Sequence, residues 1–254
     1  MIDHASRAIL LDIEGTTSSV RFVYDVMFPF ARKHLDLYLD SQWDSDECRA
    51  ACEQVAHDAG HDSLAAWCEQ AAAHDGGELD VATSQRRLVR DEIVRLMDGD
   101  VKATGLKQLQ GLIWRGGFES GELQAHVYDD VPPALDAWRQ AGCDVRIYSS
   151  GSVQAQKLFF GHTIAGDLLD RFRGHYDTTT GPKREAESYK KIAAEFGLPP
   201  SDILFLSDVV EELDAARAAG LKTGLLRRPG NAEPPAEHGH DELTDFTQVR
   251  LVKG

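Results

Sequence analysis

The chain has 254 residues, of which 42% are hydrophobic and 27% charged, so it is long enough to bury one large core or two smaller ones. Its formal net charge of −15 leaves no surplus of Lys and Arg to neutralise phosphates, so we expect no nucleic-acid partner. No apolar run approaches the length of a membrane span, and no basic start followed by an apolar segment marks a signal peptide. The four cysteines do not suggest a disulfide framework, so we expect a cytoplasmic protein that contacts no membrane.

The first predicted element is the apolar run from Ile9 to Leu11, which is typical of a buried parallel strand. Two carboxylates, Asp12 and Glu14, follow it directly, and Gly15 then allows a sharp turn. Open α/β sheets keep their ligand crevice at the carboxyl ends of the strands, so this strand would deliver Asp12 to that crevice. An isolated pair of acids at a strand end is more often a solvated surface feature, so the interpretation depends on the rest of the chain.

The segment from Val20 to about Gln124 has no convincing strand pattern. Helices are predicted there instead, over residues 22–39, 44–59, 63–73, 81–97 and 107–113. Pro29 interrupts the first of them, so we expect a kink or a late helix start at that point. This block therefore has the pattern of a helical insertion after the first strand.

From Tyr128 onward, predicted strands and helices alternate. We expect strands at 143–148, 172–177, 203–206 and 222–226, and helices at 132–142, 153–160, 184–196 and 211–219. Asp130 is predicted to cap the first of these helices, and the segment after Pro229 to be mostly irregular. Such alternation requires crossover connections and a mainly parallel sheet. The predicted fold class is therefore α/β: a doubly wound, Rossmann-like core of residues 1–19 and 125–254, with a helical cap domain of residues 20–124 inserted.

Polar residues follow three of the predicted strands, and a lone lysine precedes a helix. They are Asp12 with Glu14, Ser149 with Ser150, Asp208 with Glu211 and Glu212, and Lys183. The carboxyl ends of parallel strands share one edge, so these groups should converge. An Asp that attacks phosphorus, carboxylates that hold Mg²⁺, and a hydroxyl and an ammonium that bind phosphoryl oxygens are the groups that phosphoryl transfer through an aspartyl phosphate needs. Each group alone has an ordinary structural explanation, but the set in this order favours a phosphatase.

This order of groups resembles the haloacid dehalogenase superfamily of phosphatases. The first superfamily motif, D-x-[D/E]-G-T, matches residues 12–16, its Ser motif Ser149, its Lys motif Lys183, and its last acidic motif Asp208 with Glu212. Longer stretches, at residues 9–17, 109–115, 126–132, 148–156, 183–189 and 205–208, resemble the enolase-phosphatase family of methionine salvage. The second resemblance extends over nearly the whole chain, and Glu14 in place of the superfamily's commoner second Asp also fits it.

The resemblance implies a bifunctional enzyme that uses one Mg²⁺ per chain and acts on a small phosphorylated substrate. That substrate is 2,3-diketo-5-methylthiopentyl-1-phosphate, which is enolised and then dephosphorylated to the acireductone 1,2-dihydroxy-3-keto-5-methylthiopentene. Carried over by position, the Mg²⁺ ligands are Asp12, Glu14 and Asp208, and the groups that bind the substrate phosphate are Ser149, Ser150 and Lys183. The chemistry makes Asp12 the nucleophile and Glu14 the general acid and then base. In the superfamily the residue at position 14 also commonly offers its backbone carbonyl to the metal.

Several assignments stay open at this point. The enolisation base is unassigned, although Mg²⁺ bound to the diketone would stabilise the enolate and so lower the demand on any base. Phe22, Trp114 and Arg115 are candidates for the methylthio pocket, and packing in the cap core is the alternative for Trp114. A general sugar-phosphate or phosphoglycolate phosphatase is the alternative function. A non-catalytic binding protein is disfavoured because Asp12 and Lys183 are both present. We expect a monomer.

Overall fold

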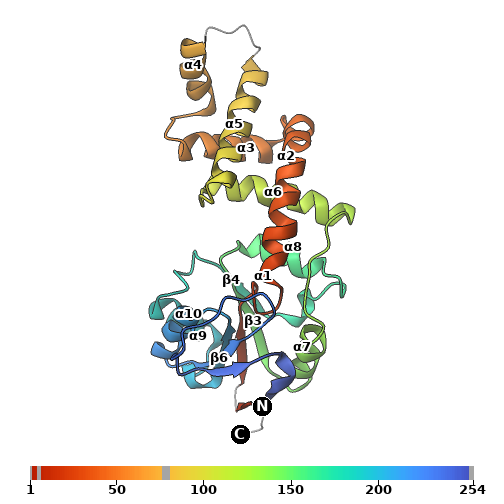
Figure 1. Cartoon of the computed structure of the whole chain (residues 1–254), viewed down its shortest axis with the longest axis vertical. Coiled ribbons are helices and arrows are strands. Elements are labelled where there is room, and N and C mark those ends of the chain that lie inside the picture. Colours follow the sequence, from red (N-terminus) through yellow and green to blue (C-terminus); the bar gives the residue numbers. More distant parts are fainter. Residues whose placement is uncertain (1, 5–6, 76–80, 252–254) are drawn as a thin grey trace. The chain divides into compact units, whose positions relative to one another are not determined.

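The computed structural model describes residues 2–4, 7–75 and 81–251 (Figure 1). The chain divides into two compact units, one of residues 1–24 and 124–254 and one of residues 25–123. The strands that the structure describes all belong to the first unit, and the described part of the second unit is built from helices. That the second unit serves as a substrate cap stays a prediction.

The core of the first unit is a six-stranded parallel sheet. Its strands lie in the order β4 (Gly174–Tyr176), β3 (Asp144–Tyr148), β2 (Ala8–Leu11), β5 (Ile203–Ser207), β6 (Lys222–Leu226) and β7 (Asp241–Leu243). Leu11 at the end of β2 stands opposite Ile147 of β3 and Leu206 of β5, so these three strands end at the same level. The predicted α/β fold class is confirmed, and the residues that follow β2, β3 and β5 start from one edge of the sheet.

Helices cover both faces of this sheet. They are α7 (Val131–Gln140), α8 (Val153–Gly161), α9 (Ala186–Phe196) and α10 (Val210–Ala218), and Figure 1 shows α9 and α10 on one side of the sheet and α7 on the other. Because side chains alternate along a strand, Leu10 and Phe205 face the side on which Tyr189 of α9 and Leu213 of α10 complete one buried cluster. Burial on both faces explains why β2 and β5 are continuous apolar runs.

Three short strands lie where the sequence pattern predicted none. β1 (Ile2–His4) pairs in parallel with β8 (Val249–Leu251), and β7 extends the main sheet beside β6. The segment after Pro229 is mostly irregular, as predicted, but residues 241–243 and 249–251 form strands that the sequence pattern did not indicate. Each of these strands has three residues, and β7 begins with the exposed acids Asp241 and Glu242, so it has no apolar run to detect. Single turns η2 (Leu169–Arg171), η3 (Pro200–Asp202) and η4 (Phe246–Gln248) complete this unit.

Asp130 lies at the N-cap position of α7, but its side chain makes no capping hydrogen bond. Its carboxylate instead accepts two hydrogen bonds from Arg228 and one from the N–H of Phe246. The prediction that this side chain caps the helix is wrong, because a buried arginine distant in sequence competes for the same oxygens.

The second unit packs five helices around its own core. They are α2 (Phe28–Gln42), α3 (Asp46–Asp58), α4 (Leu64–Asp75), α5 (Val81–Asp98) and α6 (Thr104–Ser120). A short helix α1 (Val20–Phe22) and a π-helical turn η1 (Val23–Met27) precede them. Helix α2 begins at Phe28, so Pro29 lies in its first turn, and the predicted late helix start at Pro29 is confirmed. Leu35, Val55, Ile93 and Leu109 are buried in one cluster. Helix α6 is longer than the predicted residues 107–113.

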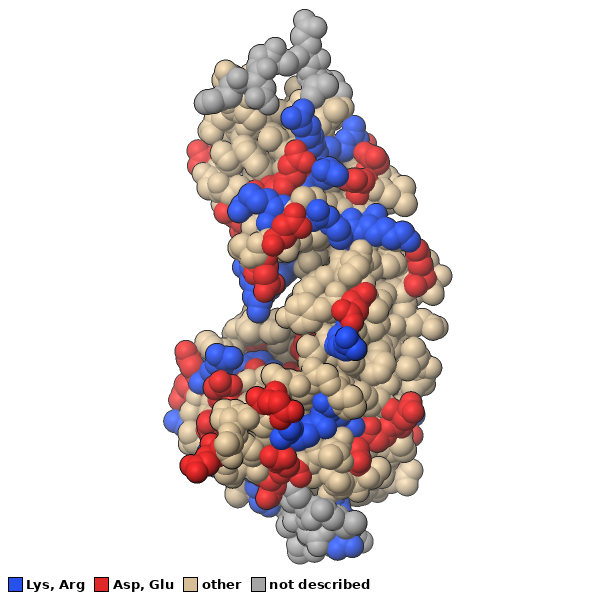
Figure 2. All heavy atoms as spheres, in the orientation of Figure 1, with Lys and Arg blue, Asp and Glu red and all other residues tan. Residues whose placement is uncertain are grey.

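Three further features concern the cysteines, the surface charge and the helices. All four cysteines, Cys48, Cys52, Cys68 and Cys143, are free thiols and buried, so no disulfide framework exists. On the face shown in Figure 2, basic and acidic side chains alternate, so no continuous basic surface is visible there. Within the described ranges, none of the helices combines the length and the apolar character that crossing a bilayer requires.

Candidate active site

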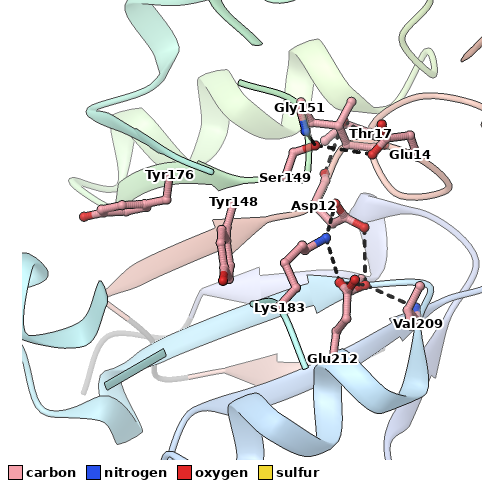
Figure 3. A network of polar contacts seen from close by, with 12 residues as sticks. Asp12, Glu14, Thr17, Tyr148, Ser149, Gly151, Tyr176, Lys183, Val209 and Glu212 are labelled. Carbon is pink, nitrogen blue, oxygen red and sulfur yellow. Dashed lines mark hydrogen bonds and ion pairs between the residues drawn. The ribbon is translucent and has the colours of Figure 1, made fainter. Parts of the chain in front are cut away.

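The residue that follows β2, Asp12, is the centre of a buried polar network (Figure 3). Its backbone N–H donates to the carbonyl of Leu206 at 3.0 Å, which fixes it to β5, and Asp12 is only 2% exposed. Lys183 donates from Nζ to Asp12 Oδ1 at 2.6 Å and lies 2.7 Å from Glu212 Oε2. The fold thus brings together a carboxylate and an ammonium that are 171 residues apart in the chain.

The charges of this network are not balanced by the one lysine. Burial alone would lower the pKa of Lys183, but the charges of Asp12 and Glu212 outweigh it and raise that pKa, so the ammonium stays charged. Burial and then the charge of Asp12 raise the pKa of Glu212 to about 7. The same two causes raise the pKa of Asp208 to about 7. Negative charge is therefore in excess at this edge of the sheet, and an added cation would relieve it.

Hydroxyl groups hold the segment that presents Lys183. Tyr189 Oη donates to the carbonyl of Lys183 at 2.7 Å, and Tyr148 Oη donates to the carbonyl of Gly181 at 2.8 Å. Gly181 has a φ of +153°, and a Cβ on it would lie 2.2 Å from Ser188 Oγ, so this position needs glycine. The lysine is therefore positioned by a rigid backbone as well as by its ion pairs.

Glu14 and Ser149 form a second pair beside Asp12. Ser149 Oγ donates to Glu14 Oε2 at 3.3 Å and accepts from the N–H of Gly151 at 3.4 Å (Figure 3). Burial and then the charge of Asp12 raise the pKa of Glu14, which favours its protonated form. A buried carboxylic acid next to a carboxylate is suited to donate a proton.

Asp208 closes the site from the end of β5. Gly15 adopts a φ of +71°, and a Cβ on it would lie 2.1 Å from Asp208 Oδ2. The glycine therefore allows the loop that carries Asp12 and Glu14 to pack directly against the Asp208 carboxylate. A side chain at position 15 would push the Asp208 carboxylate away from the loop that carries Asp12 and Glu14.

The carboxylates at this edge of the sheet are oxygen donors of the kind that Mg²⁺ binds. Among the described residues, no three His, Cys, Asp or Glu side chains gather at metal-ligand spacing. Mg²⁺ commonly needs only one or two carboxylates, because waters and phosphate oxygens complete its octahedron. Asp12 and Asp208 fit that demand, since the charge of the Asp12 carboxylate raises the pKa of Asp208 and a cation between them would relieve that repulsion. The carboxylate of Glu14, by contrast, is hydrogen-bonded to Ser149.

The structure brings most of the predicted site residues to one edge of the sheet. Asp12, Glu14, Ser149, Lys183 and Asp208 are linked there by the contacts above, whereas Ser150 and Glu211 are exposed. Sequence reasoning assigned no role to Glu212 or to Ser207, whose Oγ lies 3.4 Å from Asp12 Oδ2. Glu212 follows Asp208 by one helical turn, and Ser207 ends an apolar strand, so both had a detectable signal.

The three residues predicted for the methylthio pocket each have a partner inside their own unit. Trp114 Nε1 donates to the carbonyl of Met27 at 2.8 Å. Arg115 Nη1 donates to Glu47 at 2.9 Å. In the other unit, Phe22 packs edge-on against Phe159, with ring centroids 5.9 Å apart. Their role toward a ligand stays a prediction.

Comparison with known proteins places this geometry in a family. Residues 6–220 match the model of the haloacid dehalogenase-like hydrolases. Enolase-phosphatase E1 of Sorangium cellulosum is 48% identical over 244 residues, which are 96% of this chain and 97% of that protein. The solved UTR4 protein of Saccharomyces cerevisiae is 34% identical, with a TM-score of 0.71 over 96% of this chain and 99% of that chain. The hydrolase YfnB of Bacillus subtilis, solved bound to magnesium, shares the fold at 14% identity, with a TM-score of 0.53 over 95% of this chain and 96% of that chain. The chain therefore belongs to the haloacid dehalogenase-like hydrolases and, within them, to the enolase-phosphatase E1 family.

Proposed function

We propose that this protein is a bifunctional, Mg²⁺-dependent enolase-phosphatase of methionine salvage. Its substrate is 2,3-diketo-5-methylthiopentyl-1-phosphate, and its products are the acireductone 1,2-dihydroxy-3-keto-5-methylthiopentene and phosphate. Family membership supports this function, and one observation carries the chemistry. That observation is the buried contact of Asp12 with Lys183, 2.6 Å long, beside the acid Glu14.

Asp12 acts as the nucleophile of the phosphatase step. One oxygen of its carboxylate attacks phosphorus while the bond from phosphorus to the substrate oxygen breaks. Lys183 donates to Oδ1 and Ser207 to Oδ2, so both oxygens are held in place for this step. The same ammonium, together with the hydroxyls of Ser149 and Ser150, donates to the phosphoryl oxygens. Glu212 keeps Lys183 in place, since its Oε2 lies 2.7 Å from Nζ.

Glu14 moves the protons. Because its pKa is raised, it enters the reaction protonated and gives its proton to the leaving oxygen of the substrate. The resulting carboxylate then takes a proton from the water that attacks phosphorus in the aspartyl phosphate, which restores Asp12 and releases phosphate. Before substrate binds, Ser149 orients the Glu14 carboxyl through its 3.3 Å hydrogen bond, and its single hydroxyl proton turns to the phosphate when substrate is present.

Asp12 and Asp208 would hold Mg²⁺, with the backbone carbonyl of Glu14 as a further oxygen ligand. When bound, the ion neutralises charge on the phosphate and on the enolate that forms from the diketone. Its positive charge would also offset the repulsion that raises the pKa of Asp208.

The test is an anaerobic assay on the phosphorylated diketone that follows enediol absorbance and free phosphate together, with Mg²⁺ and with EDTA. We expect an enediol rise coupled to phosphate release, both lost in EDTA. Phosphate release from simple sugar phosphates without action on the diketone would move the function to a general small-molecule phosphatase. A monomeric state and a cytoplasmic location remain parts of this proposal, and light scattering and cell fractionation test them.

A further inference from the structure

The catalytic loop, residues 13–18, turns its amide groups inward. The N–H groups of Thr16, Thr17 and Ser18 all donate to the carbonyl of Ile13, at 3.0–3.2 Å. The loop therefore folds around one oxygen, and the carbonyls of Gly15, Thr16 and Thr17 point away from that centre. How those outward carbonyls are held decides how rigid the loop is.

Side chains from outside the loop donate hydrogen bonds to two of these carbonyls. Arg228 donates from Nε to the carbonyl of Thr16 at 3.1 Å, across 212 residues of sequence. Asn231 donates from Nδ2 to the carbonyl of Gly15 at 2.9 Å and to that of Leu226 at 3.1 Å. The chain segment that follows β6 thus holds two adjacent peptides of the catalytic loop.

Arg228 is itself fixed on several sides. Its side chain is 4% exposed, and it pairs in bidentate fashion with Asp130, at 2.8 and 2.7 Å. Its guanidinium carbon lies 4.3 Å from the ring centroid of Tyr128 and 5.0 Å from that of Phe246. A planar guanidinium held by a two-oxygen fork and two rings has a defined orientation, so the Nε–H that faces Thr16 is pre-aligned.

The loop needs such support because of Gly15. Glycine crosses between backbone conformations at little cost, and the φ of +71° at Gly15 is one of several that it can adopt. Rotation of the peptide between Gly15 and Thr16 would change the packing of the loop on Asp208 and the direction of Glu14. No side chain at position 15 resists that rotation.

We infer that Arg228, assisted by Asn231, is a positioning residue for phosphoryl transfer. Arg228 holds the peptide between Thr16 and Thr17, and Asn231 holds the peptide between Gly15 and Thr16, so that Asp12, Glu14 and Asp208 keep their mutual geometry. Neither residue contacts the reacting groups, so the effect acts on orientation. This inference rests on the proposed function in that it takes Asp12 and Glu14 as the reacting groups.

A matched ion pair elsewhere in the same unit provides the control. Arg146 pairs with Asp144 through Nε at 3.1 Å and Nη2 at 2.9 Å, and its guanidinium lies 4.1 Å from the ring centroid of Phe196. It also donates to Tyr176 Oη at 2.6 Å. The pair has the same chemistry and a similar aromatic contact, but its partners lie on β3, β4 and α9 and not in the catalytic loop.

The experiment compares Arg228→Met with Arg146→Met in the full chain. We expect Arg228→Met to lower kcat about ten- to hundredfold with KM nearly unchanged, since small misplacements of reacting groups cost rate more than binding. Arg228→Lys should recover only part of kcat, because a lysine keeps the charge but cannot bind both oxygens of Asp130 in the planar geometry of a guanidinium. Arg146→Met should lose stability without this fall in kcat. Amide exchange at Thr16 to Ser18 should accelerate in Arg228→Met alone.

Wild-type kcat and wild-type amide exchange in folded Arg228→Met would overturn the inference, as would an equal fall of kcat in Arg146→Met. If Arg228→Met does not fold, Asn231→Ala decides, because it removes the hydrogen bond to Gly15 and keeps the buried ion pair. A lowered kcat with faster exchange in that variant supports the inference, and wild-type values refute it. If the wild type hydrolyses para-nitrophenyl phosphate but not the diketone, the proposed function fails while the same comparison still tests Arg228. The exchange measurement decides without any turnover.

Discussion

Replacing Asp208 with Asn tests whether the site opposes folding when no cation is bound. Burial and then the charge of Asp12 raise the pKa of Asp208 from an ordinary 3.8 to about 7. The folded protein therefore keeps a proton on this group between those two values, where the unfolded chain has lost it. Stability must then fall as the pH rises through that window and level off above it. A tenfold change in an acid dissociation constant is worth about 1.4 kcal/mol, so the full effect approaches about 4 kcal/mol.

Asn has nearly the shape of Asp and carries no charge, so Asp208→Asn removes this cost. Without metal, we expect the variant to be about 2 to 4 kcal/mol more stable than the wild type above pH 7, with a difference that shrinks toward pH 4. The wild type should gain stability from Mg²⁺ by mass action, and the variant should gain little and lose phosphatase activity.

Urea denaturation followed by circular dichroism, in EDTA and in Mg²⁺ over a series of pH values, measures these differences. Glu211→Gln is the matched control, because Glu211 is an exposed acid near Asp208 on the first turn of α10. The reasoning is refuted if Asp208→Asn is no more stable than the wild type in EDTA above pH 7. It is also refuted if the stability advantage of the variant is the same in acid.

Three further variants follow from the same geometry. Asp12→Asn should abolish phosphate release and leave the circular dichroism spectrum unchanged, and normal turnover would rule out the aspartyl-phosphate mechanism. Lys183→Met leaves Asp12 and Glu212 without their cation, so the free energy of unfolding near neutral pH should fall by about 3–5 kcal/mol in urea, and unchanged stability would contradict the ion-pair argument. Burial and then Lys157 lower the pKa of His175 from 6.5 to about 4, so wild-type stability should fall as the pH drops through that window. His175→Gln should have a shallower acid slope in thermal melts, and an identical slope would exclude His175 as its source.

The sequence predicted the fold best at strands that are buried along their whole length. The strands β2 and β5 were predicted because parallel strands covered on both faces are apolar throughout. Strands β3 and β6 were also predicted, although each begins with partly exposed polar residues. The residues that end them, Asp12, Ser149 and Asp208, followed from the rule that such strands share one ligand-binding edge. For Lys183 and Asp12 the sequence predicted only that both lie at that edge. It could not predict their ion pair, because a separation along the chain does not give a distance in space.

Other features had no local signal. Strand β7 is three residues long and begins with two acids, so only pairing with β6 makes it a strand. Asp130 was predicted as a cap from its position before Pro132, and the competing partner Arg228 lies 98 residues away. Arg228 and Asn231 donate to backbone carbonyls, which every residue possesses. The residue types in the catalytic loop therefore could not predict these two contacts.

The interrupted layout of the first unit has a consequence for synthesis of the protein on the ribosome. Residues 25–123 are contiguous and contain their own core, so this unit is complete as soon as it leaves the exit tunnel. Strand β2 emerges before it, yet its neighbours β3 and β5 end at Tyr148 and Ser207. Ser207 follows Leu11 by 196 residues, which at usual elongation rates corresponds to roughly 10–40 s. During that interval β2 lacks its neighbour β5, and it also lacks β3 until Tyr148 has been made, so the nascent chain presents an incompletely paired apolar strand.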